Sequence, residues 1–129
     1  MINGFELETA PLSDYEKEEL LPAITRILVG HVGSRSAITN KQIVALLSPT
    51  YKVTDSRVRK VINHIRNNDL IPCLLATSDG YFVAEDEAEV TAYEESLLGR
   101  ELAIQAVRAS IARQKEIKYR NAPVQGRLF

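Results

Sequence analysis

The stretch TNKQIVALLSPTYKVTDSRVRKVINHIRNN, residues 39–68, contains two helix starts on either side of a proline. Thr39 followed by Gln42 is a capping box, in which each side chain bonds the backbone of the other, so a helix is predicted over about residues 40–47. Ser48-Pro49-Thr50 ends this helix, because proline lacks the backbone donor that a helix needs. The first half of the stretch therefore predicts a short helix with clear bounds.

The second half of the stretch predicts a longer helix that is apolar on one face and basic elsewhere. Thr54 is a good N-cap, and Asp55 in the first turn complements the helix dipole. Residues 54–68 contain four Lys or Arg and one acid, although the whole chain of 129 residues has a net charge of -1. Four apolar side chains recur at helical spacing on one face: Val58, Val61, Ile62 and Ile65.

Another helix is predicted upstream of this stretch, from Ser13 to about Gly33. Ser13 and Glu16 form a second capping box, and apolar residues follow at helical spacing. Pro22 interrupts the pattern, so either a kink or a fresh helix start is expected there. Residues 1–12 show no clear period and are interpreted as an N-terminal leader.

Downstream of Asp69 the pattern changes from helical to extended. Residues 70–76 and 81–84 are short apolar runs on either side of an Asp79-Gly80 turn, which predicts a β-hairpin. Cys73 falls in the first run and is interpreted as a small core residue. The chain is thus expected to be mainly α with a small β-hairpin, around a single hydrophobic core.

Residues 85–118 predict one long helix, because they contain no proline and little β-branching, and residues 119–129 form a tail. Apolar residues recur seven apart on this helix, in a partial coiled-coil pattern: Val90, Leu97, Ile104 and Ile111. Its second half carries more apolar surface than one small domain needs, which predicts a homodimer through Ile104, Val107 and Ile111. The alternative is that these side chains fold back on the first helix.

The element order helix, helix, turn, helix, hairpin resembles the winged helix-turn-helix superfamily over residues 13–84. That resemblance implies a winged helix-turn-helix domain followed by the long C-terminal helix. More narrowly, the run from Asp69-Leu70-Ile71-Pro72 to Leu98-Gly99-Arg100 resembles small uncharacterised winged-helix proteins of phages and prophages of Bacteroides-type bacteria. The second resemblance implies a phage-related, DNA-associated protein with a role in replication or its control.

The helix of residues 54–68 has a polar and basic face opposite its apolar anchors, as a DNA-recognition helix needs. Arg and Lys suit phosphates or guanine edges, and Asn suits adenine edges. A solvated helix face is the alternative, but such faces usually mix Glu with Lys, and no Glu is present here. With two flanking lysines included, the residues predicted to contact DNA are Lys41, Lys52, Ser56, Arg57, Arg59, Lys60, Asn63, His64, Arg66 and Asn67.

The C-terminal sequence QGRLF, residues 125–129, resembles the short peptide by which bacterial replication and repair proteins dock on the sliding clamp. The recurring positions of that peptide are Gln, Leu and Phe, which correspond to Gln125, Leu128 and Phe129. Gly126 and Arg127 depart from the commonest middle residues. The alternatives are a frayed terminus or a tail that caps the surface of its own domain.

Neither an enzyme nor a metal site is predicted. His31 and His64 lack a matched Ser, Cys or carboxylate partner, and one cysteine cannot form an internal disulfide. No cofactor motif is found. The N-terminus lacks a secretory signal and no apolar run is long enough to cross a membrane, so a cytoplasmic location is expected.

Together these patterns predict a non-catalytic protein that binds duplex DNA as an accessory or regulator in replication or transcription. The alternative is a winged helix that serves as a protein–protein adaptor in a replication assembly, with its basic face on an acidic partner.

Overall fold

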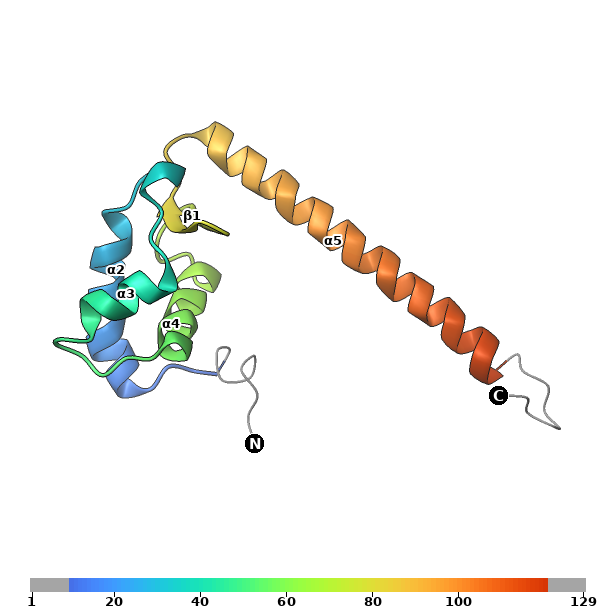
Figure 1. The fold of residues 1–129 in the computed structure, drawn as a ribbon, viewed down its shortest axis with the longest axis horizontal. Coiled ribbons are helices and arrows are strands. Elements are labelled where there is room, and N and C mark those ends of the chain that lie inside the picture. Colours follow the sequence, from blue (N-terminus) through green and yellow to red (C-terminus); the bar gives the residue numbers. More distant parts are fainter. Residues whose placement is uncertain (1–9, 121–129) are drawn as a thin grey trace. The chain divides into compact units, whose positions relative to one another are not determined.

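The computed structural model describes residues 10–120, which are mainly helical, with a two-stranded antiparallel sheet and a long C-terminal helix (Figure 1). The chain divides into two units, with the boundary after Val90. Residues 1–9 and 121–129 lie outside the described part of the chain. The three residues of the predicted clamp peptide, Gln125, Leu128 and Phe129, therefore also lie outside it.

The first helical segment changes its geometry next to Pro22, where the sequence predicted a kink or a fresh helix start, but the helix is not broken there, since Leu20 and Leu21 both have helical backbone angles. The capping box is formed, since the Ser13 N–H donates to Glu16 Oε1 at 2.8 Å and Ser13 Oγ accepts the Glu16 N–H at 3.2 Å. The chain then forms a π-helical turn, η1 (Glu16–Leu20), and α2 (Leu21–Val29) begins with Pro22 in its first turn. A π-helical turn ahead of Pro22 suits proline, because proline has no N–H for a regular helical hydrogen bond.

Both helices of residues 39–68 form where the sequence predicts them. α3 (Asn40–Leu47) has the complete capping box at its start. α4 (Asp55–Asn67) begins after Thr54, whose side chain accepts the Arg57 N–H. Figure 1 shows α2, α3 and α4 grouped together, and each of these helices contacts the other two.

The core of the first unit lies between these three helices. All four predicted anchors of α4 are buried, which confirms the assignment of its apolar face. The largest fully buried side chains come from the first helical segment, α3 and α4: Leu20, Ile24, Leu28, Ile43, Ile62, Ile65, Val58 and Val61. Burial of each such side chain contributes about 1.5–3 kcal/mol relative to exposure, so this cluster dominates the stability of the unit.

The predicted β-hairpin is present but its first strand is shorter than expected. β1 (Leu74–Thr77) pairs with β2 (Gly80–Val83) across a turn at Ser78-Asp79. Residues 70–73 are not in the strand. Cys73 has a φ of 56°, in the left-handed region that an extended strand does not contain. Its side chain is exposed, so the prediction of a core cysteine is wrong.

A segment before α3 pairs with the other edge of β2, which the sequence did not predict. The Ile38 N–H donates to the Tyr81 carbonyl at 2.9 Å, and the Tyr81 N–H donates to the Ile38 carbonyl at 2.8 Å. The Val83 N–H also donates to the His31 carbonyl at 2.8 Å. The 3-10 turn η2 (Ser34–Ser36) lies between these two contacts in sequence. β2 is therefore hydrogen-bonded on both of its edges.

The predicted long helix is confirmed as α5 (Glu87–Lys115), which continues as the π-helical turn η3 (Glu116–Arg120). No side chain of either element is buried. The large apolar side chains of residues 97–120 are at least 41% exposed.

Candidate nucleic-acid interface

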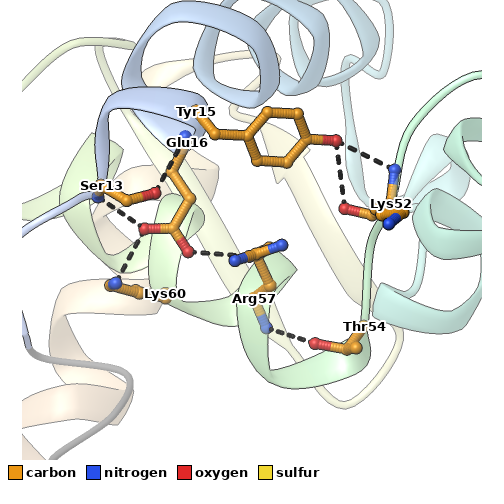
Figure 2. A network of polar contacts seen from close by, with 7 residues as sticks. All are labelled: Ser13, Tyr15, Glu16, Lys52, Thr54, Arg57 and Lys60. Carbon is orange, nitrogen blue, oxygen red and sulfur yellow. Dashed lines mark hydrogen bonds and ion pairs between the residues drawn. The ribbon is translucent and has the colours of Figure 1, made fainter.

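A buried carboxylate, Glu16, ties the start of the first helical segment to the basic helix α4 (Figure 2). Glu16 is 3% exposed. Its Oε1 accepts the Lys60 ammonium at 2.7 Å, and its Oε2 accepts Arg57 Nε at 3.0 Å. Because Oε1 also accepts the Ser13 N–H, one carboxylate completes a helix cap and neutralises charge from two cations.

The pKa of Glu16 is lowered to about 2 by this environment. Burial alone raises the pKa of a carboxyl group, because it disfavours the charged form. Here the hydrogen bonds from Lys60, from the Ser13 N–H and from Arg57, with the charge of Lys60, outweigh that effect. The folded protein therefore holds Glu16 ionised well below the pH at which an ordinary glutamate takes up a proton.

This depressed pKa is expected to make the first unit acid-sensitive. The contribution of Glu16 is fully present above its ordinary pKa of 4.5 and is lost as the pH falls toward the folded-state pKa of about 2. Urea unfolding measured across this window should show that the free energy of unfolding falls by about 2–3 kcal/mol because Glu16 becomes protonated. In Glu16→Gln this component should be absent, and an equal acid loss in the variant and the parent would contradict the assignment.

Tyr15 links the same segment to the turn before α4. Its hydroxyl accepts the Lys52 N–H at 2.9 Å and donates to the Lys52 carbonyl at 3.2 Å (Figure 2). The guanidinium of Arg57 lies over the Tyr15 ring, 5.3 Å from its centroid. The Lys52 side chain remains exposed. The Tyr15 hydroxyl therefore bonds both the N–H and the carbonyl of Lys52, which fixes the backbone that carries the Lys52 side chain.

Two of the predicted DNA contacts lie elsewhere than the sequence suggested. Lys60 is 8% exposed, so its predicted place on an exposed polar face is wrong. Arg57 keeps a 37% exposed side chain, but its Nε is engaged by Glu16. The helical projection of α4 could not show this, because the covering carboxylate belongs to a segment more than forty residues earlier in the chain.

The N-terminal segment also borders the outer side of α4 near its C-terminal end. Pro11 lines a shallow groove together with Asn63, His64 and Asn67. Asn63 and His64 are half-buried, whereas Asn67 is exposed. These three predicted contacts thus lie together, at a groove wall and not on an open helix face.

The remaining predicted residues are spread over two parts of the surface. Ser56, Arg59 and Arg66 on α4 are half-buried. In helical projection Arg59 and Arg66 lie away from Lys60 and Arg57, whereas Ser56 lies next to Lys60, one turn before it. Lys41 on α3 is exposed. After Asp55, α4 contains no acidic residue.

Sequence reasoning missed the residue that joins α3, α4 and β2. Asn40 Nδ2 donates to the Asp55 carbonyl at 3.0 Å, and the Tyr81 hydroxyl donates to Asn40 Oδ1 at 3.4 Å. This amide therefore holds the starts of α3 and α4 together. The only sequence signal for this role of Asn40 is a polar residue just inside a capping box, and that signal does not predict which residues Asn40 contacts.

Comparisons of the chain with models of known protein families, with curated proteins and with solved structures give no significant match. Within residues 10–120, no helix is both long and apolar enough to cross a membrane. The same residues contain no group of three or more His, Cys, Asp or Glu side chains placed to hold a metal ion.

Proposed function

We propose that residues 13–84 act as a winged helix-turn-helix that binds duplex DNA without catalysing a reaction, with α4 as the recognition helix. The observation that carries the proposal is that α4, which Glu16 ties to the first helical segment, contains several basic residues and no acidic residue after Asp55. The hydrogen bonds between Ile38 and Tyr81 support the same reading, because a winged helix needs a short strand beside its hairpin.

The proposed interface differs from the one that the sequence alone suggested. Arg59 and Arg66 would contact phosphates or guanine edges, and Asn63 and Asn67 would lie nearest to base edges. Lys41 and Lys52, both exposed, would contact the phosphate backbone on either side. Lys60 would act indirectly, through its ion pair with Glu16, by fixing the orientation of α4.

Replacing Arg59 by alanine is expected to weaken binding to a fluorescein-labelled duplex by about tenfold, which corresponds to the loss of one phosphate or base contact. Fluorescence anisotropy at about 50 and 200 mM salt should also show a steep fall in affinity for the parent protein and a shallower fall for Arg59→Ala. The duplex should be a pool of random sequences, since the proposal does not specify an operator.

Arg26→Ala is the matched control for this experiment. Arg26 is an exposed arginine on α2, so its replacement removes the same charge from another helix. If both variants lost affinity equally, binding would reflect net charge and not α4. If the parent showed no binding at low salt, the DNA-binding proposal would be wrong.

The second candidate function is a protein–protein adaptor. One observation favours it, namely that Arg57 and Lys60 already share a carboxylate within the chain, which leaves fewer cations to neutralise phosphates. In that case α4 would bind an acidic protein surface. Absence of DNA binding at low salt, with the fold intact by circular dichroism, is the result expected for an adaptor.

As a DNA-binding module the protein would serve as an accessory or regulator in replication or transcription. The phage relationship and the docking of Gln125, Leu128 and Phe129 on a bacterial sliding clamp remain predictions from the sequence. A peptide of residues 118–129 that fails to bind a bacterial clamp would remove the second of these.

A further inference from the structure

The helix α5 presents an apolar seam made of Leu97, Ile104, Val107 and Ile111. These side chains are 41%, 68%, 64% and 56% exposed. Three of them recur seven residues apart and Val107 follows Ile104 by three, which is the spacing of the core positions of a coiled coil. Helices gain most of their stability from packing such a face, so a seam this exposed indicates a missing partner.

A charged row runs beside this seam, also at intervals of seven residues. Its members are Glu94, Glu101, Arg108 and Lys115, all of them exposed. The two acids come first and the two bases follow, so the row is negative toward the start of α5 and positive toward its end. With Leu97, Ile104 and Ile111 at heptad position a and Val107 at position d, the charged row occupies position e, which flanks the core beside the partner helix.

We propose that two copies of the chain pair through this seam with their α5 helices antiparallel. Reversing one helix brings Leu97 of each copy opposite Val107 of the other. The same register sets Glu101 beside Arg108 and Glu94 beside Lys115 of the second copy. Leu97 then meets Val107, Ile111 meets Tyr93 of the second copy, and each acid of the row meets a base, which identifies a second copy of this chain as the occupant.

A parallel pair does not use the charged row in this way. In a parallel coiled coil, position e of one helix faces position g of the other. Position g here holds Ser96, Ala103 and Ser110. None of these side chains is charged, so Glu94 and Lys115 would have no opposite charge across the interface. The charge pattern therefore favours the antiparallel orientation.

Arg100 occupies the one core position near the middle of the seam that is not apolar. In the antiparallel register it lies opposite Ile104 of the second copy. Its aliphatic stem can pack there while the guanidinium reaches water at the edge of the interface. A polar residue at a core position costs stability but fixes the register of a coiled coil, so Arg100 favours this one alignment.

The first test is the mass of the full chain in solution. Sedimentation equilibrium at tens of micromolar protein is expected to give twice the 14.4 kDa of one chain. Ile104→Glu should return the protein to a monomer with its circular dichroism largely unchanged. A parent protein that stays at 14.4 kDa in this range would overturn the proposal.

The orientation is tested with cysteines in a background that lacks the exposed native thiol, Cys73→Ser. A mixture of Leu97→Cys and Val107→Cys chains should form a mixed disulfide on mild oxidation, whereas Leu97→Cys alone should not. In a parallel pair the result would be reversed, because positions ten residues apart are then about 15 Å apart along the helix, beyond the reach of a disulfide. Rapid crosslinking of Leu97→Cys with itself would therefore contradict the antiparallel pairing.

Charge exchange tests the row independently of the seam. One variant, Glu94→Lys/Glu101→Lys, makes the row wholly basic, and the other, Arg108→Glu/Lys115→Glu, makes it wholly acidic. Each alone should be monomeric, and the two mixed should form a heterodimer that weakens with salt. If each variant dimerised alone as well as the parent does, the row would have no part in the interface. None of these measurements involves DNA, so they stand apart from the proposed function.

Discussion

Replacing Glu16 by glutamine is expected to destabilise the first unit by about 3–5 kcal/mol, because it leaves the Lys60 ammonium buried without its charge partner. Glutamine keeps the shape of the side chain and can still complete the helix cap. The loss therefore reports the ion pairs and not the packing. Lys60 is 8% exposed and loses most of its hydration in the fold, whereas the Arg57 side chain is 37% exposed and can be rehydrated in place.

The measurement is hydrogen exchange of core amides in α4, such as that of Ile62, whose slow exchange reports global opening of this unit. Glu18→Gln is the matched control, since Glu18 lies in the same π-helical turn but is exposed. A second variant, Glu16→Gln/Lys60→Met, should recover much of the lost stability, because it removes the unpaired charge. Equal protection in Glu16→Gln and Glu18→Gln would show that the buried pair contributes nothing.

Replacing Gly80 by alanine should have the other large effect, a loss of about 3 kcal/mol or more in the stability of the first unit. The φ of Gly80 is 124°, a conformation that side chains rarely adopt. A Cβ built there would lie 2.4 Å from the carbonyl oxygen of Ile38. That oxygen accepts the Tyr81 N–H, so the methyl group would push apart the very backbone pair that joins β2 to the segment before α3.

Urea unfolding and hydrogen exchange of the Ile38 and Tyr81 amides measure this effect directly, because both amides are bonded across the pair. Gly30→Ala is the control in the same unit. Gly30 follows α2 with an ordinary negative φ, and an added Cβ there would make only a normal contact at 3.5 Å. Gly30→Ala should therefore be close to neutral. A Gly80→Ala protein that is as stable as Gly30→Ala would show that the close approach at Ile38 relaxes without cost.

The sequence predicts best those features that are set by neighbouring residues. The bounds of α3 and the start of α4 follow from their caps, since Thr39 and Thr54 each bond a backbone group within three residues. The buried face of α4 follows from helical periodicity in the same way. Such signals need no knowledge of the rest of the chain.

What the sequence did not predict depends on contacts between distant segments. Periodicity places Lys60 opposite the core, and it takes the tertiary structure to show that Glu16 covers that side. The pairing of Ile38 with Tyr81 involves one residue of a segment without strand-like alternation, so no pattern marks it. The positive φ of Cys73 likewise shortens β1 within a run that is apolar throughout. The bounds and the buried face of α4 were therefore predicted correctly, whereas the predicted exposure of Lys60 was wrong.

The hydrogen bonding on both edges of β2 has a consequence for solubility. Within residues 10–120, only the outer edge of β1 remains as a template on which another chain could add a strand. That edge is four residues long and is preceded by Pro72 and by the left-handed Cys73, both of which prevent it from extending. Because β2 is paired on both edges and β1 is a short strand that cannot extend, the small sheet is protected against edge-to-edge aggregation, even though it lacks the closure of a barrel.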